Sequence, residues 1–423
     1  MAKILIASIG AGPYQSTCYQ IEDREGTLQS YENEKLTPYV LYRHLKLDRV
    51  FFIGTAGSRW DEIYAAFCRD NYNSEYYHHL AELVRQKQAY KGQLEQLEQA
   101  LNNNSKCIVV DEGVSELEIW NNFSEIVQSL YELNDGDEIY IDITHAFRSL
   151  ALFQFLIFNF IKDILSEKNV RIAGVYYGLY NPDKTPIINL TPLLSLTDWT
   201  KGVYILKNIG NGYLVSNLLD QQGESTAATR IRQLSDAINL NYLDSIGERS
   251  RNLQIALNQM QPAGPFEYVK PTLDEFIGEF AVSDDRYKTD PFFQLKLAEW
   301  YIKCGRYATA YITLTESIVT YICKHYDYDP TRRESREAIR QALGRNEEVN
   351  DPRLRGIDRT ELGRLFKQEI NPVRRHIAHA SFSDIKGRRL QNAGFNKAIE
   401  EAERRCQAVR VIFDQNTLGG NAD

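Results

Sequence analysis

The stretch KILIASIGAGP, from Lys3 to Pro13, begins with β-branched and apolar residues and ends in a glycine turn. A strand that runs directly into such a turn is typical of the first strand of an α/β domain. The turn has the first two glycines of a dinucleotide-binding loop, but no third glycine stands at the expected place. The stretch therefore predicts the start of an α/β domain and argues against an ordinary dinucleotide as its ligand.

The same pattern of a strand followed by a polar or glycine turn recurs along the first part of the chain. The further strand-like runs are residues 49–53, 106–110, 138–143 and 170–177, and the segments with helical periodicity between them are 38–45, 59–69, 117–133 and 149–165. Strands that alternate with helices favour an open, doubly wound parallel sheet of the Rossmann-like kind. In such a sheet, ligands bind outside the carboxyl ends of the strands, which is the edge where these turns lie.

The pattern changes near Trp199. From there to the C-terminus the segments are helical, apart from a break with proline and glycine at residues 261–271. Residues 290–325 predict two helices, and a charged insertion follows at 327–359. We therefore expect three domains: an α/β domain at residues 1–198, a helical connector at 199–289 and an all-α helical bundle at 290–423.

The composition fits a folded protein in water. Hydrophobic residues make up 43% and charged residues 25% of the 423 positions, as in globular proteins. The most apolar stretch, residues 150–161, is shorter than a membrane span. The N-terminus has no signal region, and the six cysteines form neither a C-x-x-C pair nor a Cys/His cluster. We therefore expect a cytoplasmic protein with no membrane partner, no disulfide framework and no metal cofactor.

Charge is distributed unevenly along the chain. The formal net charge is −8, which excludes a sequence-wide attraction to nucleic acid. Residues 331–410 nevertheless hold 19 Lys and Arg against 12 Asp and Glu. Helices with solvated charged faces give the same balance, so charge by itself leaves open whether this part contacts nucleic acid.

The segment DITHAFRSL, residues 142–150, lies where the fourth strand ends and a helix begins. A helix N-terminus offers free backbone amides to an anion. The segment adds polar side chains that suit the same ligand, namely Thr144, His145, Arg148 and Ser149. It therefore predicts an anion site, although a turn and a helix cap would also explain Asp142 and Thr144.

Two of the seven histidines, His376 and His379, fall in the segment QEINPVRRHIAHA at residues 368–380. Asn371 followed by Pro372 predicts a helix start, with RRHIAH in the first two turns, where the amide dipoles favour anions. Two arginines and two histidines suit phosphodiester chemistry, because a guanidinium stabilises a phosphorane and an imidazole transfers protons near neutral pH. RNA supplies its own 2′-hydroxyl nucleophile, so this route needs no metal. The alternative is an exposed basic helix face with one buried histidine.

The RRHIAH stretch resembles the Arg, four residues, His signature of the HEPN-domain ribonucleases, and its IAHA ending is typical of that family. The resemblance implies that Arg374 and His379 are the active-site pair, on a helical bundle that dimerises so that two copies form one composite site. The family more often has Asn, Asp or His where this chain has Arg375. On a helix Arg375 shares a face with His379, whereas Arg374 lies about 140° around from it. We rank Arg374 first and Arg375 second as the catalytic arginine, and give His376 either a phosphate-orienting role or a packing role.

The DITHAFRS segment resembles the D-x-T-H-G-x-R-S signature of CARF domains, the sensor modules of type III CRISPR systems that bind cyclic oligoadenylates. The first turn and the segment TPLLSLTDW at residues 191–199 also resemble that family. The resemblance implies a homodimer in which amide-rich turns surround one symmetric cleft. The implied ligand-binding residues lie in three turns: Ser8, Ile9, Gly10, Ala11 and Gly12; Gly54, Thr55 and Ala56; and Asp142, Thr144, His145, Ala146, Phe147, Arg148 and Ser149.

The two signatures occur in the order sensor then nuclease, as in the CRISPR-associated CARF–HEPN ribonucleases. The resemblance implies a cyclic-oligoadenylate-activated, metal-independent endoribonuclease that cuts single-stranded RNA in antiviral defence and leaves 2′,3′-cyclic phosphate ends. Cyclic tetra-adenylate is the expected activator, with the hexa-adenylate as the second choice, and a homodimer or a higher homo-oligomer is the expected assembly. Two alternatives stay open: a ligand-responsive regulator that binds nucleic acid without cutting it, and a ring nuclease that cleaves the cyclic adenylate in the sensor cleft.

Overall fold

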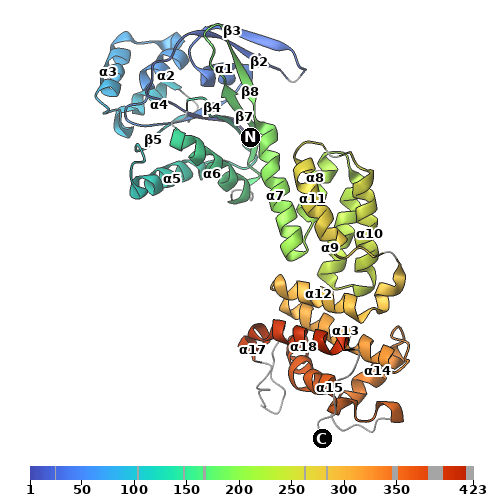
Figure 1. The fold of residues 1–423 in the computed structure, drawn as a ribbon. Helices are drawn as coiled ribbons and strands as arrows, with labels where there is room; N and C mark the ends of the chain where they lie inside the picture. The colour runs from blue at the N-terminus through green and yellow to red at the C-terminus, as the bar shows by residue number, and fades with distance from the viewer. Residues whose placement is uncertain are drawn as a thin grey trace. The chain divides into compact units, whose positions relative to one another are not determined.

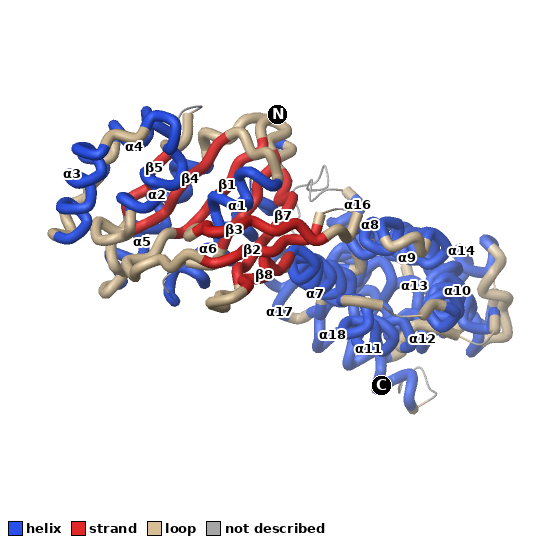
Figure 2. Tube along the Cα trace, turned by 90° about the horizontal axis from the view of Figure 1, so that it is seen from above, coloured by secondary structure: helices blue, strands red, loops and turns tan. Residues whose placement is uncertain are grey.

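The computed structural model describes the chain except for residues 24, 102–103, 146–147, 165–167, 262, 283, 345–350, 380–393 and 416–423. The chain divides into two compact units, Met1–Leu194 and Ser195–Asp423. Among the described residues, strands occur only in the first unit, and the second unit is helical (Figure 1, Figure 2). The further boundary that the sequence predicts near residue 290 stays a prediction.

The first unit is built on one sheet in the order β3-β2-β8-β7-β6-β1-β4-β5. The central strands β7, β6, β1, β4 and β5 run parallel, β2 is parallel to β8, and the pairs β2/β3 and β7/β8 are antiparallel. The strands are β1 Lys3–Ser8, β2 Thr17–Glu22, β3 Leu28–Glu34, β4 Arg49–Gly54, β5 Lys106–Val109, β6 Glu138–Asp142, β7 Arg171–Gly178 and β8 Lys184–Asn189. The predicted doubly wound parallel sheet is confirmed, and the mixed edge of β2, β3 and β8 is an addition to it.

Helices cover both faces of this sheet. Successive residues of a strand point to opposite faces, and apolar residues on both faces need to be buried. Leu5 and Ala7 of β1 pack in one core, whereas Ile4 and Ile6 pack in the other. Figure 1 shows helices α1 to α4 on one side of the strands, and α5 and α6 on the other. These helices are α1 Thr37–His44, α2 Trp60–Phe67, α3 Ser74–Arg85, α4 Glu95–Leu101, α5 Glu116–Leu130 and α6 Arg148–Ile164, with short 3-10 turns at Arg69–Asn71 and Lys91–Gln93.

The direction of winding reverses at β1. The strands β4 and β5 lie on one side of β1, while β6 and β7 lie on the other. The connections therefore leave the carboxyl ends of β1 and β6 in opposite directions, which opens a crevice between them. Gly54 keeps the neighbouring turns in contact, since a Cβ there would lie 2.6 Å from Cγ1 of Ile9. The fold thus places the first glycine turn next to the segment that follows β6.

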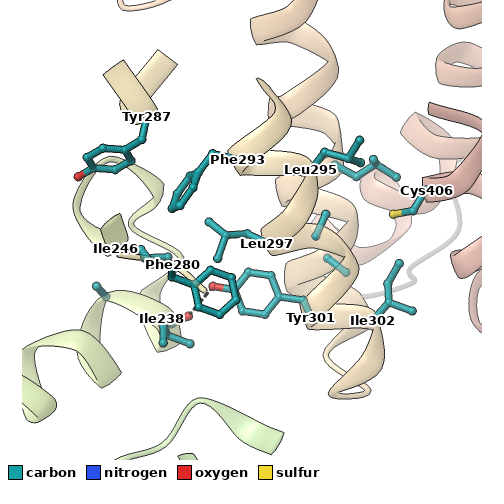
Figure 3. Close-up of a cluster of buried hydrophobic side chains, with 14 of the residues drawn as sticks. Ile238, Ile246, Phe280, Tyr287, Phe293, Leu295, Leu297, Tyr301, Ile302 and Cys406 are labelled. Atoms are coloured by element: carbon teal, nitrogen blue, oxygen red, sulfur yellow. Dashed lines mark hydrogen bonds between the residues drawn. The ribbon is translucent and has the colours of Figure 1, made fainter. Parts of the chain in front are cut away.

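The second unit packs its helices around one continuous core. Figure 3 shows part of this core, where Phe280, Leu297 and Tyr301 lie together and the Tyr301 hydroxyl donates to the carbonyl oxygen of Ile238 at 3.2 Å. The α-helices are α7 Thr191–Ile209, which crosses the boundary between the units, α8 Tyr213–Gln221, α9 Ser225–Leu240, α10 Leu243–Gln259, α11 Pro265–Gly278, α12 Pro291–Lys303, α13 Tyr307–His325, α14 Arg333–Ala342, α15 Glu361–Leu365, α16 Asn371–Ala378, α17 Phe395–Glu400 and α18 Ala402–Asp414. A π-helical segment, η7 Phe366–Ile370, lies between α15 and α16, and 3-10 turns occur at Asp285–Thr289, Pro352–Leu354 and Ile357–Arg359.

One sequence expectation for this unit needs correction. The break expected at residues 261–271 is shorter, because α11 begins at Pro265 and continues through Pro271. A proline in the first helical turn removes no helical hydrogen bond, so Pro265 starts the helix. The charged insertion contains α14, whose Ile339 is buried and whose Arg336 and Arg340 form ion pairs with Glu316 of α13. The two helices expected at 290–325 are confirmed as α12 and α13.

Candidate functional site

A cavity of about 430 Å³ lies at the carboxyl ends of β1, β6 and β7. Four of the predicted ligand-binding residues line it: Gly10, Gly12, Thr144 and His145. The other residues of the lining were not predicted; they are Pro13, Tyr14, Gln15, Tyr19, Lys35, Tyr177, Gly178 and Tyr180. Tyr14 and Gln15 directly follow the glycine turn. Tyr177 and Gly178 end β7, the strand next to β6, and Tyr180 follows it. Strand adjacency is therefore the signal that could have identified these five residues.

The predicted residues of the second turn support the cavity without lining it. Thr55 N–H donates to the Ser58 hydroxyl at 2.9 Å, and that hydroxyl donates to the Ile9 carbonyl oxygen at 3.0 Å. Gly54 contacts Ile9 from the neighbouring strand, and Ala56 accepts a backbone hydrogen bond from Ala89. These contacts fix the shape of the first turn.

The first turn and the DITHAFRSL segment contain the remaining predicted ligand-binding residues. Ser8 and Ile9 are fully buried, and Ala11 is exposed. The predicted helix start is confirmed, since α6 begins with Arg148 and Ser149. Ala146 and Phe147 lie outside the described residues.

The Tyr14 hydroxyl accepts a hydrogen bond from a backbone N–H of the first turn, which is one of the groups expected to bind phosphate. The Gly10 N–H donates to the Tyr14 hydroxyl at 2.9 Å, and that hydroxyl donates back to the Gly10 carbonyl oxygen at 3.3 Å. The Tyr14 ring lies against the imidazole of His145, with ring centroids 4.6 Å apart. The first turn is therefore shaped by Tyr14, and its outer glycine, Gly12, is the exposed one.

A short hydrogen-bond chain links β6 to β7 below the cavity. Asp142, the last residue of β6, accepts the Thr144 N–H at 2.9 Å and also the Thr144 hydroxyl. The oxygen of that hydroxyl accepts the Gly178 N–H at 2.8 Å. Gly178 has no room for a side chain, because a Cβ would lie 2.6 Å from Oγ1 of Thr37. Thr144 is thereby held in one orientation at the floor of the cavity.

Burial shifts the pKa of two groups at the cavity. Removal from water raises the pKa of the fully buried Asp142 carboxyl to about 7, although the hydrogen bonds from Thr144 oppose the shift. Removal from water also lowers the pKa of His145 to about 4, so its imidazole is neutral at pH 7. Nε2 of His145 is buried and has no hydrogen-bond partner among the described residues. A ligand that enters the cavity therefore lies beside a neutral imidazole rather than a cationic one.

The Asp142→Asn variant is expected to become more stable relative to the wild type as the pH rises from about 4 to 7. The pKa of Asp142 is 3.8 in the unfolded chain and about 7 in the folded protein. At a pH between these two values, the folded protein keeps a proton on Asp142 that the unfolded chain releases. Rising pH therefore lowers the wild-type free energy of unfolding, by up to about 4 kcal/mol when the shift is complete. Urea unfolding of both proteins between pH 4 and 8 measures this difference.

The opposing titration of His145 is common to both proteins and cancels in the difference. Asp183→Asn is the matched control, since Asp183 is an exposed carboxylate of the same unit, and its difference from the wild type should not follow the same pH course. A difference between Asp142→Asn and the wild type that stays constant with pH would contradict the raised pKa.

The α-helix α16 begins at Asn371 as predicted, but Asn371 does not cap a free helix N-terminus, because the π-helical segment η7 runs directly into α16. The segment from Glu361 to Ala378 is helical without interruption, and the Asn371 N–H donates to the Phe366 carbonyl oxygen in the π pattern. Pro372 has no N–H and its ring crowds the preceding carbonyls of an α-helix, and the wider π turn makes room for it. The RRHIAH stretch therefore lies at the C-terminal end of α16, where the helix dipole favours cations rather than anions.

The two faces of α16 differ in character. Val373 is buried, and Ile377 packs against the core of the second unit. Arg375 and His379 are exposed on the opposite side, and the His379 N–H donates to the Arg375 carbonyl oxygen at 3.1 Å. Arg374 and His376 are half-buried between these faces, and none of the four basic side chains forms a hydrogen bond or ion pair with another described residue. The structure thus presents Arg375 and His379 to solvent as one pair.

Among the described residues, no group of three or more His, Cys, Asp or Glu side chains is arranged to hold a metal ion. No helix in that part of the chain is long and apolar enough to cross a membrane.

A doubly wound sheet with polar groups converging on a cavity at its switch point defines a Rossmann-like ligand-binding domain. Residues 4–181 match the CARF domain model of the CRISPR system endoribonuclease Csx1, and residues 195–284 match the model of the second domain of the CRISPR-associated protein MJ1674. By these two matches, the chain is similar to CARF-containing, CRISPR-associated proteins.

One curated relative is similar over nearly the whole chain. The CRISPR-associated protein MJ1674 of Methanocaldococcus jannaschii is 28% identical over 421 residues, which cover 93% of this chain. The chain spans 61% of the length of that relative. A solved structure of Enterococcus italicus Csm6 bound to cyclic hexa-2′-fluoro-hexa-dAMP covers 98% of this chain and 95% of its own, with 13% identity and a TM-score of 0.39.

Proposed function

We propose that the protein is a homodimeric endoribonuclease that cuts single-stranded RNA without a metal when cyclic tetra-adenylate binds its CARF domain. The observation that carries the proposal is the placement of the RRHIAH residues on α16. The helix buries its apolar side through Val373 and leaves Arg375 and His379 facing solvent, where an RNA phosphate can reach them. The match of residues 4–181 to the CARF domain of an endoribonuclease supports the same pairing of sensor and nuclease.

The reaction that these side chains support is an intramolecular transesterification. The RNA 2′-hydroxyl loses its proton and attacks the adjacent phosphorus, and the bond from phosphorus to the 5′-oxygen breaks. His379 takes part in this proton transfer, and Arg374 from each subunit stabilises the phosphorane, with Arg375 as the alternative arginine. His376 orients the phosphate. The products are a 2′,3′-cyclic phosphate and a 5′-hydroxyl.

Activation is a population shift of the dimer. The ligand phosphates contact the exposed turn at Gly12 and the neutral imidazole of His145 in the cavity, and binding favours the arrangement in which the two RRHIAH segments form one site. The ligand achieves this shift only through a higher affinity for the active arrangement.

Cleavage of a fluorescent single-stranded RNA in EDTA, with and without cyclic tetra-adenylate, tests the proposal. We expect cleavage only with the ligand, at protein concentrations where a dimer forms, and an unchanged rate in EDTA. Ligand binding without cleavage would instead favour a non-catalytic regulator. Loss of activity in EDTA would contradict the metal-independent route, and slow disappearance of the ligand itself would identify a ring nuclease.

A further inference from the structure

Two side chains that the proposed function does not use, Gln15 and Tyr180, meet at the rim of the cavity. Gln15 lies on the loop after β1, and Tyr180 lies on the loop after β7. The Tyr180 hydroxyl donates a hydrogen bond to Oε1 of Gln15, and both residues line the cavity. Both are exposed, and Tyr180 keeps 51% of its surface accessible. The pair therefore closes one side of the cavity while leaving its own outer surfaces open.

The backbone next to this pair is anchored. The hydroxyl of Thr17, two residues after Gln15, donates to the carbonyl oxygen of Asn181, the residue after Tyr180, at 2.9 Å. The Thr185 hydroxyl donates to the same oxygen at 3.0 Å, and both threonines are buried. One carbonyl oxygen thus joins the two loops, so Gln15 and Tyr180 are held in place before any ligand binds.

The chemistry of the two side chains suits a nucleobase. A primary amide presents an acceptor and a donor side by side, which complements the N6 amino group and N7 of adenine. The bond from Tyr180 uses one lone pair of the Gln15 oxygen, and the second lone pair and the amide N–H groups remain for a base. A tyrosine ring is a platform on which a base stacks. The same cavity holds Thr144 and His145, so base and phosphate contacts lie within one site.

We propose that Gln15 and Tyr180 form the adenine-binding part of the cavity. The Gln15 amide pairs with the N6 and N7 edge of one adenine, and the Tyr180 ring stacks against it. This inference rests on the proposed function for its ligand class, and it names the residues that select adenine over other bases.

Calorimetric binding of cyclic tetra-adenylate and of cyclic tetra-inosinate to the full chain tests the assignment. Inosine carries a carbonyl oxygen in place of the N6 amino group, so it opposes the acceptor of a bidentate Gln15 amide. We expect the wild type to prefer the adenine ring by about tenfold or more, and Gln15→Ala to bind the two rings equally within roughly a factor of three. Tyr180→Ala should weaken both rings by about fivefold or more through the loss of stacking.

Gln93→Ala is the matched control, because Gln93 is an exposed glutamine of the same unit outside the cavity lining, and it should bind both rings as the wild type does. If Gln15→Ala keeps the full preference for adenine while the wild type binds cyclic tetra-adenylate, the inference is wrong and the proposed function stands. If the wild type binds neither ring, the proposed ligand class is wrong, and this inference is wrong as well.

Discussion

Replacing His379 by alanine is expected to lower ligand-activated RNA cleavage by about 100-fold or more, because a positioned proton-transfer group contributes ~10²–10⁴-fold to a rate. His379 follows α16 directly and is exposed, so its removal leaves the buried side of the helix unchanged. Single-turnover cleavage of a fluorescent RNA at saturating cyclic tetra-adenylate measures the effect. Binding of the activator to the first unit should stay at the wild-type level.

His325→Ala is the matched control for this variant. His325 is also an exposed histidine at the C-terminal end of a helix in the second unit, on α13, and its replacement should leave cleavage unchanged. A His379→Ala dimer that cuts RNA as fast as the wild type would remove the basis of the proposed mechanism.

The arginine assignment is tested in the same assay. The resemblance to HEPN ribonucleases implies Arg374, whereas the structure exposes Arg375 on the side of His379 and leaves Arg374 half-buried. We expect Arg374→Ala to lose more activity than Arg375→Ala. The reverse order would transfer the phosphorane-stabilising role to Arg375.

The strands that sequence reasoning found are those buried on both faces. Runs such as Ile4 to Ile6 of β1 and Val50 to Ile53 of β4 are continuously apolar because helices cover both sides of the sheet. The strands that it missed lie at the mixed edge. β3 is mostly exposed and has no apolar alternation, and β8 contains Pro186, which sequence rules take as evidence against a strand. β3 is formed by hairpin pairing with β2, and β8 by pairing with β7 and with the distant strand β2.

The candidate sites were predictable only in part, for related reasons. The glycine turn and the DITHAFRSL segment could be placed at one edge because parallel strands end together. Lys35 and Tyr180 enter the cavity from the mixed edge, whose existence the sequence pattern did not predict. The helical segments α15 and η7 directly before α16 were missed, because Asn371 and Pro372 form a strong local start signal. A π turn precedes Asn371 in the structure, and no residue pattern in the segment predicts that turn.

A fully buried arginine connects α18 to the segment that precedes the RRHIAH helix. Arg405 donates to the Tyr311 hydroxyl at 2.6 Å and to Glu401 at 2.9 Å, and its Nε lies 3.4 Å from Glu369 in η7. Its neighbour Arg404 pairs with the same two glutamates, but 54% of the Arg404 side chain is exposed. The two arginines therefore share partners and differ in burial.

Arg405→Ala is expected to lower the free energy of unfolding of the second unit by about 3–5 kcal/mol, because it empties a filled position in the core and breaks a buried charged network. Arg404→Ala should cost at most about 1 kcal/mol, since an exposed ion pair is screened by water. Urea unfolding of both variants measures the comparison. Equal losses would mean that charge alone, rather than burial, decides the contribution. A larger loss for Arg405→Ala would instead show that the burial of this arginine, which contacts α13 through Tyr311 and η7 through Glu369, decides its contribution.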